Sequence, residues 1–222
     1  MDTNELVKKV SGLLSQQNLL NRSGAVLYSA AKTITKGDVY ILGLNPGGTQ
    51  GPTLAEHLEK LPAKIDNDYL ATDWGNRDGT LAPLQIRLAE LLKVWNHYIE
   101  DVCASNLIFM QSRDASGIQF PEDAALCWPV HEKLLEIVQP KRILVFGNSS
   151  RSPYRFLFDK FGSNAFESII LAGHGNWKCR SFVATHLGRK VRVYGLPHLS
   201  RYSPLDSRGK VKEHIVEWLT QD

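Results

Sequence analysis

Short apolar runs of strand length, with little polar alternation, are the feature that most constrains what this chain can fold into. They include residues 38–43, 102–109, 141–147 and 190–196. A strand with one face in water alternates polar and apolar residues, whereas a strand buried on both faces does not. The runs therefore predict a three-layer α/β/α fold with a central, mainly parallel sheet of about four strands. Residues 168–192 hold two further runs and can instead form a hairpin inserted before the last strand.

Apolar residues at helical spacing fill the intervals between these runs. They predict helices from three sets of residues: Leu6, Val10, Leu13 and Leu14; Leu84, Leu88, Leu91, Leu92 and Trp95; and Val211, Ile215, Trp218 and Leu219. Ser152 before Pro153, and Pro121 before two acids, are typical helix starts. No shift in composition marks a boundary, so we expect one domain over residues 1–222, with an N-terminal helical segment over about residues 1–36.

The composition is that of an ordinary globular protein, with 43% apolar and 22% charged residues. No apolar run approaches the length that crosses a membrane, and the start MDTNELVKKV does not read as a secretion signal. Cys103, Cys127 and Cys179 form no CxxC pair, which argues against a disulfide framework or a common metal site. We expect a cytoplasmic monomer that needs no cofactor or metal and binds no membrane.

Positive charge is concentrated in one part of the sequence. Residues 178–212 contain nine Lys or Arg residues and one acid, Asp206, for a net charge of +8, whereas the whole chain carries only +3. Such a segment suits binding to a phosphate backbone, because each neutralised phosphate releases condensed counterions. A solvated basic face without a partner is the alternative.

The residues that follow the apolar runs are the candidates for a site, because ligands of open α/β sheets bind beyond the carboxyl ends of the strands. They are small, polar or basic: Asn45, Pro46, Gly47 and Gly48; Gln111, Ser112, Arg113 and Asp114; Asn148, Ser149 and Ser150; and Pro197, His198, Leu199, Ser200, Arg201 and Tyr202. Alone, Asn45-Pro46-Gly47 is typical of a tight turn. Its placement on the same predicted rim as the other loops favours a functional site.

Common catalytic and nucleotide-binding motifs do not fit these loops. The segment GLNPGGTQGPT lacks the lysine of a phosphate-binding loop and the glycine spacing of a dinucleotide-binding loop. No GxSxG motif of a serine hydrolase occurs. A metal site from His174, Cys179, His186 and His198 is conceivable, but the spacing matches no common pattern.

Two loops carry paired motifs, GLNPGG at residues 43–48 and HLSRYS at residues 198–203. Together they resemble the uracil-DNA glycosylase superfamily, in which a G-x-N-P-G motif follows the first strand and an H-P-S-P motif follows the last. The first motif is most similar to the single-strand-selective and mismatch-specific branches. VCASNLIF also resembles the family's middle strand. Leu199 and Arg201 depart from the family by standing where it has prolines.

The resemblance implies a DNA glycosylase, a hydrolase that flips out a uracil or another altered base and breaks its bond to the sugar. It implies that Asn45 orients the attacking water and that His198 donates a hydrogen bond to the base oxygen. An amide takes no proton near neutral pH, so the role of Asn45 is positional. The imidazole can donate in either its neutral or its charged form.

Further residues are assigned to base and DNA contacts on the same resemblance. The base-binding residues are Gly43, Leu44, Pro46, Gly47 and Asn106, with Tyr69 or Trp74 as the stacking aromatic residue. The DNA-binding residues are Gly48, Ser149, Ser150, Ser200, Arg201 and Tyr202, and the last two stand where the family inserts its wedge. DNA, single- or double-stranded, is the implied partner.

Two alternatives stay open for the function. Residues 49–80 and the insert GHGNWKCRSF have no counterpart in the family and flank the expected pocket, so the substrate can be a modified cytosine of foreign or phage DNA. The other alternative is a catalytically silent module that binds nucleic acid.

Overall fold

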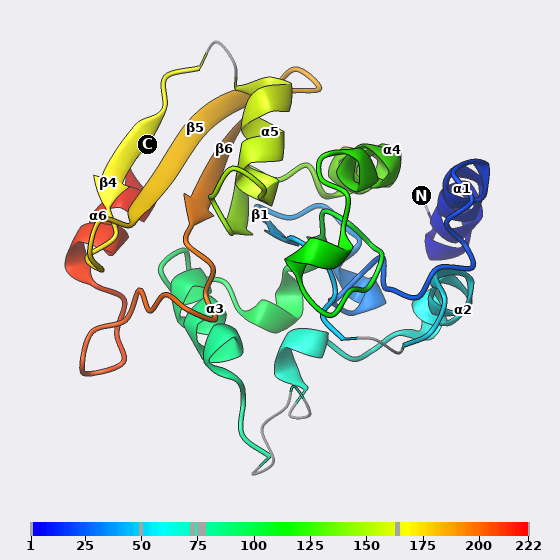
Figure 1. Cartoon of the computed structure of the whole chain (residues 1–222), viewed down its shortest axis with the longest axis horizontal. Coiled ribbons are helices and arrows are strands. Elements are labelled where there is room, and N and C mark those ends of the chain that lie inside the picture. The colour runs from blue at the N-terminus through cyan, green and yellow to red at the C-terminus, as the bar shows by residue number, and fades with distance from the viewer. Residues whose placement is uncertain (1, 49–50, 72–73, 75–78, 163–164, 222) are drawn as a thin grey trace.

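A mixed six-stranded sheet forms the centre of the protein in a computed structural model that describes residues 2–48, 51–71, 74, 79–162 and 165–221 (Figure 1). The strands are β1 Val39–Gly43, β2 Cys103–Asn106, β3 Arg142–Phe146, β4 Ser168–Leu171, β5 Lys178–His186 and β6 Arg189–Leu196. Their order across the sheet is β2-β1-β3-β6-β5-β4. The first four strands in this order are parallel, while β5 runs antiparallel to both β6 and β4.

The α/β class is confirmed, but the expectation of about four strands in a mainly parallel sheet is wrong. The sheet is extended on one side by β5 and β4, which pair antiparallel through the register Ile169 with Arg180. The alternative of a hairpin over residues 168–192 agrees better with the structure, because β5 and β6 pair antiparallel and are joined by a tight turn at Leu187 and Gly188. β5 is largely alternating in burial, as expected for a strand at the less covered side of a sheet.

Helices lie on both faces of the sheet. They are α1 Thr3–Gln16, α2 Leu54–Lys60, α3 Pro83–Lys93, α4 Glu122–Val138, α5 Pro153–Phe161 and α6 Glu213–Thr220. Short turns of 3-10 helix lie at Ala31–Thr33, Leu61–Ala63, Asp68–Leu70, Ile99–Asp101 and Ala115–Gly117. The three helices predicted from apolar spacing correspond to α1, α3 and α6, and Ser152 caps α5 as predicted. In the N-terminal segment, residues 18–30 are irregular and run beside β2, where the Tyr28 amide donates to the Ala104 carbonyl at 2.8 Å.

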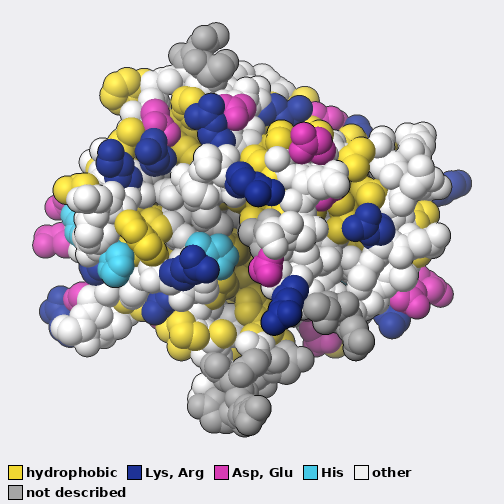
Figure 2. All heavy atoms as spheres, in the orientation of Figure 1, with side chains coloured by type: hydrophobic (Ala, Val, Ile, Leu, Met, Phe, Trp, Pro, Cys, Tyr) yellow, Lys and Arg dark blue, Asp and Glu magenta, His cyan; other side chains and the backbone are white. Residues whose placement is uncertain are grey.

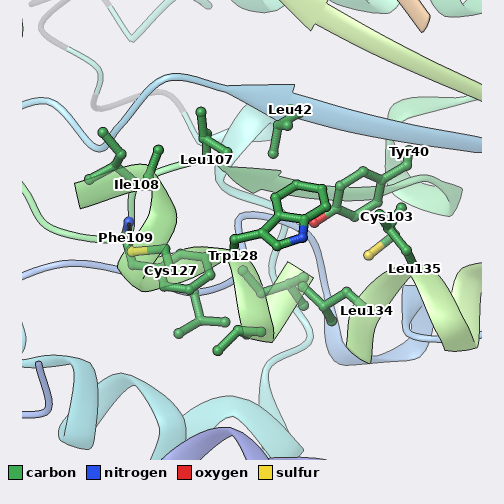
Figure 3. Packing of buried hydrophobic residues seen from close by; sticks show 14 of the residues in the cluster. Tyr40, Leu42, Cys103, Leu107, Ile108, Phe109, Cys127, Trp128, Leu134 and Leu135 are labelled. Carbon is green, nitrogen blue, oxygen red and sulfur yellow. Dashed lines mark hydrogen bonds between the residues drawn. The ribbon is translucent and has the colours of Figure 1, made fainter. Parts of the chain in front are cut away.

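Alternate residues of the buried strands face two separate hydrophobic clusters. Tyr40 and Leu42 of β1 pack with residues of α1, α2, α4 and α5, and Figure 3 shows Trp128 and Leu135 of α4 in this cluster. Val39 and Ile41 of the same strand pack with residues of α3 and α6 on the other face. Both faces of the strand are therefore buried, which explains its continuous apolar sequence.

The carboxyl ends of the four parallel strands lie nearly level at one edge of the sheet. Gly43 is in register with Asn106, and Phe146 is in register with Leu196. We call this the carboxyl edge. The loops that follow β1, β2, β3 and β6 all leave the sheet there, so the fold brings the sequence-predicted loops together. Within the described residues, none of the helices has the length and apolarity that a bilayer crossing requires.

Candidate active site at the carboxyl edge

The first motif loop, residues 44–48, holds its asparagine in a fixed orientation. Asn45 is half-buried, and its Nδ2 donates to the Pro46 carbonyl at 2.9 Å and to Ser112 Oγ at 2.8 Å. The Ser112 amide in turn donates to the Pro46 carbonyl at 3.1 Å. Both hydrogens of the Asn45 amide are thus engaged by the chain, which leaves its Oδ1 as the atom suited to accept a hydrogen bond from water.

The end of β1 requires a glycine because another side chain occupies the space beside it. A Cβ at Gly43 would lie 2.1 Å from Asn106 Oδ1 and 3.0 Å from the ring of Phe146. Asn106 is buried, with 3% of its surface exposed. Burial raises the pKa of the neighbouring Tyr28 hydroxyl, and a hydrogen bond with the Asn106 side chain acts in the opposite direction. The side-chain amide of Asn106 therefore lies at the carboxyl edge, directly against the backbone of Gly43.

The second motif loop, residues 197–204, presents His198 at the surface. The Ser200 amide donates to His198 Nδ1 at 3.3 Å, and Ser200 Oγ lies 2.8 Å from the same nitrogen. Partial burial of the ring lowers the pKa of His198, and the positive charge of Arg201 lowers it further. A neutral ring whose Nδ1 accepts a hydrogen bond carries its proton on Nε2. The arrangement thus favours a neutral imidazole with Nε2–H as a donor.

This second loop is anchored by buried side chains and by α3. Leu199 and Tyr202 are fully buried, and the Tyr202 hydroxyl donates to the Ala172 carbonyl at 2.8 Å. Arg87 Nη1 of α3 donates to the Leu199 carbonyl at 2.6 Å. The expectation that Tyr202 contacts DNA as part of a wedge is therefore wrong for this conformation, because its ring is a core residue. Leu199, in place of a proline, serves as an apolar anchor.

The two motif loops face the same part of the molecule. β1 and β6 are both neighbours of β3, so their ends are two strand spacings, roughly 10 Å, apart. The ring of Phe146 at the end of β3 lies between them, 5.7 Å from the His198 ring by centroids and close to Gly43. Figure 2 shows His and Lys or Arg side chains beside a hollow near the centre of this face. Asn45 and His198 therefore follow strands that end at the same edge of the sheet, on either side of β3.

The two candidates for the stacking aromatic residue differ in access. Tyr69 is buried, with 2% of its surface exposed, and its ring packs 6.3 Å from Phe146. Trp74 is half-buried, 5.3 Å from Tyr69 and 6.1 Å from Tyr28. The expectation that Tyr69 stacks on a base is not supported by its burial, whereas Trp74 offers part of its ring to a cavity.

That cavity has a volume of about 870 Å³ and opens beside the first motif loop. Its lining includes Pro46, Gly47, Tyr28, Trp74 and Gln111. A further wall contains His57, Lys60, Lys64, Asp66 and Asp68. Burial, together with the nearby charge of Lys64, lowers the pKa of His57 to about 4, so this ring is neutral at physiological pH. The cavity is large, and its lining combines charged and polar side chains with the aromatic rings of Tyr28 and Trp74.

The remaining predicted residues lie at the carboxyl edge with different exposure. Leu44 is half-buried against the cluster that contains α4, and Pro46 is buried. The others are exposed and accessible to a ligand: Gly47, Gly48, Ser149, Ser150, Ser200 and Arg201.

The basic segment is more widely spread than its sequence suggests. Arg189 and Lys190 begin β6 and so lie at the opposite edge of the sheet from His198. Arg180 and Arg208 are paired with Glu167 and Asp206 at 2.8 and 2.9 Å. Only part of the segment therefore lies near the candidate site. The cations of this segment at the carboxyl edge include Lys178 and Arg201.

Some site residues escaped sequence reasoning. Phe146 ends an apolar run and looked like a core residue, while Tyr28 and His57 lie in segments without a motif. Arg87 lies on α3, where the apolar spacing predicts a helix but gives no role to the polar residues between. The contact of Ser112 with Asn45 was within reach, because both follow predicted parallel strands.

A metal centre finds no support in the part of the chain that the structure describes. No group of three or more His, Cys, Asp or Glu residues there is arranged to hold a metal ion. Among the four residues considered above, Cys179 is buried, and His186 lies at the far end of β5 from the carboxyl edge.

Comparison with protein-family models gives no match, and comparison with curated proteins gives none either. The resemblance to the uracil-DNA glycosylase superfamily therefore stays a prediction from the motifs. What the geometry adds is the adjacency of those motifs at one edge of the sheet.

Proposed function

We propose that the protein is a DNA glycosylase, with the fold of the uracil-DNA glycosylase superfamily, that hydrolyses the bond between an altered base and its deoxyribose. The observation that carries the proposal is the position of Asn45 and His198 on loops that leave the same edge of the sheet, on either side of β3. The bare backbone of Gly43 and the buried amide of Asn106, which lie side by side at the ends of β1 and β2, support a pocket for a flipped base.

The proposed reaction needs little covalent chemistry from the chain. The carbon-nitrogen bond breaks and its electron pair leaves with the base, whose oxygen becomes negative. His198 donates to this oxygen through Nε2–H, and the donation is strongest as the charge develops. A water held by Asn45 Oδ1 attacks the positive sugar carbon and then releases its proton to the solvent. Asn106 offers its amide to the polar edge of the base.

The size of the cavity supports a second candidate, a glycosylase for enlarged bases such as modified cytosines of foreign DNA. About 870 Å³ lies in the upper part of the range, roughly 300–1,000 Å³, that takes drug-sized ligands. A bare pyrimidine fills only a small part of such a space. His57, Lys60 and Asp66 add hydrogen-bonding groups that suit a polar substituent on the base.

The test is base release from a panel of oligonucleotides. Single- and double-stranded DNA carrying uracil, hypoxanthine, or cytosines with small or bulky polar substituents is incubated with the native protein, Asn45→Ala and His198→Ala. Alkali-labile abasic sites report cleavage. We expect each substitution to slow release by about 10²–10³-fold, the loss typical of removing one transition-state contact. His97→Ala, at the opposite edge of the sheet, is the control and should cleave normally.

Two results would count against the proposal. If His198→Ala cleaves every substrate as fast as the native protein, the catalytic assignment is wrong. If the native protein retards all the oligonucleotides and leaves them intact, the alternative of a silent nucleic-acid binder replaces it.

A further inference from the structure

The turn between β4 and β5, residues 172–177, carries an exposed aromatic residue that the proposed reaction does not use. Trp177 is 39% exposed, and the ring of His174 lies edge-on to it at 4.7 Å. The turn is closed by hydrogen bonds from the Ala172 amide to the Trp177 carbonyl and from the Trp177 amide to the His174 carbonyl, at 2.8 and 3.1 Å. Trp177 is therefore held by a short, ordered turn rather than by a core.

This turn is tied to the loops of the candidate active site. The buried Tyr202 hydroxyl donates to the Ala172 carbonyl, and the Tyr202 ring lies 6.5 Å from that of Trp177. Asn148, in the loop after β3, donates through Nδ2 to the carbonyls of Lys178 and Gly195 at 2.7 and 2.9 Å. The position of Trp177 relative to the second motif loop is thus fixed by two contacts of Tyr202, and Asn148 ties the start of β5 to the end of β6.

The surroundings of Trp177 are basic. Lys178 and Arg201 are exposed, and Lys212 Nζ lies 5.7 Å from the centre of the Tyr202 ring. The two acids between residues 165 and 212, Glu167 and Asp206, are both engaged in ion pairs with arginines. Among the described residues, Lys178 and Arg201 form no ion pair. An aromatic face next to such cations is the combination that binds single-stranded nucleic acid, because bases stack on the ring while cations hold the phosphates.

We propose that the β4–β5 turn is a stacking platform for the DNA strand next to the flipped nucleotide. Trp177 stacks on an unpaired base of that strand, and Lys178 and Arg201 contact its phosphates. The inference rests on the proposed DNA binding but not on base release, so the two can fail separately. It gives the site a preference for single-stranded over double-stranded DNA, since a paired base offers no free face to the ring.

The test measures binding to an unmodified, end-labelled single-stranded oligonucleotide by fluorescence anisotropy at fixed low salt. We expect Trp177→Ala to weaken binding by about tenfold, a loss typical of one base–aromatic stack, and Trp177→Phe to retain most of the affinity. Tyr98→Ala is the matched control, because Tyr98 is 62% exposed but precedes β2 at the opposite edge of the sheet. Equal melting temperatures of the variants would show that the fold is intact.

A pair of lysine variants tests the charge contribution. For single strands, each phosphate contact adds about 0.7 to the slope of log affinity against log salt. Lys178→Ala should reduce the slope by about that amount, whereas Lys190→Ala, at the other end of the sheet, should leave it unchanged.

The outcomes separate this inference from the catalytic one. If the native protein releases bases and Trp177→Ala binds single strands as well as the native protein does, the platform is wrong and the glycosylase proposal stands. If no base is released but Trp177→Ala still loses affinity, the platform stands without catalysis. If the native protein binds no nucleic acid at all, the platform is wrong.

Discussion

The two motif loops leave the same edge of the sheet but are held in place in different ways. The first loop is fixed from within the carboxyl edge, where Ser112 and Gln111 bond to its backbone and Gln111 Nε2 donates to the Gly47 carbonyl at 2.6 Å. The second loop is fixed from outside, by Leu199 and Tyr202 in the core and by Arg87 of α3.

This difference predicts which substitutions will disturb each loop. The orientation of Asn45 depends on its direct contacts with Pro46 and Ser112, so substitutions at these contacts act on it directly. The position of His198 depends on anchors in other elements, so substitutions remote from the chemistry can misplace it. A displacement of about 1 Å in such a group costs roughly 10²-fold in rate. The predictions below test this contrast, from the largest effect to the smallest.

The largest effect is expected from adding one methyl group to the floor of the first loop. Gly43→Ala places a Cβ 2.1 Å from Asn106 Oδ1, so Asn106 and the Phe146 ring must move. We expect a loss of about 2–3 kcal/mol in the free energy of unfolding, typical of overpacking, together with loss of base release. Urea unfolding measures the first quantity and the oligonucleotide panel measures the second.

Gly47→Ala is the matched control for this prediction. Nothing lies within 4 Å of a Cβ at Gly47, so the added methyl group meets open space. We expect stability within about 0.5 kcal/mol of the native protein, as for ordinary surface substitutions. Equal losses in the two variants would contradict the view that close packing at the strand end, rather than the glycine backbone, sets the requirement.

Buried His57 in the cavity wall should make the protein sensitive to acid. Burial lowers its pKa to about 4 from 6.5, so the unfolded chain takes up a proton that the folded chain refuses between these values. Its contribution to stability is therefore complete above pH 6.5 and is lost as the pH falls towards 4, by roughly 3 kcal/mol in total. Urea unfolding of the native protein and of His57→Gln at pH 7 and pH 5 measures it.

The variant should lose less stability between the two pH values than the native protein. His131 is buried with a pKa also lowered to about 4, so a residual pH dependence is expected in both proteins. An identical pH dependence of the two proteins would show that His57 is protonated or solvated in the folded state.

Arg87→Ala tests the remote support of the second loop. The substitution removes the donor to the Leu199 and Ser200 carbonyls and leaves the side chains of His198 and Asn45 unchanged. We expect single-turnover base release to fall by about tenfold, or about 1.4 kcal/mol in barrier, while DNA affinity changes less. Arg87→Lys should recover part of the rate, because lysine also donates a hydrogen bond. A parallel fall in affinity and rate would instead indicate direct contact with DNA.

The smallest effect is a shift in the pH dependence of catalysis. Burial of the ring is the main cause that lowers the pKa of His198, and the charge of Arg201 adds to it. In Arg201→Gln the second cause is absent, so the pKa of His198 rises. If the neutral ring is the active form, the acid limb of the rate profile moves to higher pH. A shift towards lower pH would contradict this.

Much of the fold was available from the sequence because the apolar runs are physically unambiguous. Residues 38–43 and 141–147 became β1 and β3, since burial on both faces removes alternation. The antiparallel extension was harder, because β4 and β5 carry weaker patterns with exposed Ile169 and Leu171. The capping box of Thr53 and Glu56 marks the start of α2, a short helix whose apolar spacing is too brief to predict it.

For the site, the sequence predicted which loops meet but not which of their side chains are accessible. Strand order fixes which loops meet, and motif loops at the ends of parallel strands share an edge, so Asn45 and His198 could be paired from the chain alone. The burial of each side chain depends on tertiary packing and could not be predicted from the sequence. Tyr202 lies within the second motif but its side chain is buried in the core, and Tyr69 is likewise buried beside a half-buried Trp74. The cavity is lined by α2, by short turns of 3-10 helix and by irregular segments, and no sequence periodicity describes how these meet.

The intrinsic fluorescence of Trp74 can report on the contents of the cavity. Its indole ring borders the cavity and lies within 5.3 and 6.1 Å of two tyrosine rings, close enough for those rings to pass absorbed light to it. A molecule entering the cavity changes the polarity around the indole and hence the colour and yield of its emission. Comparison of the native protein with Trp74→Phe therefore isolates a label-free signal for screening small molecules.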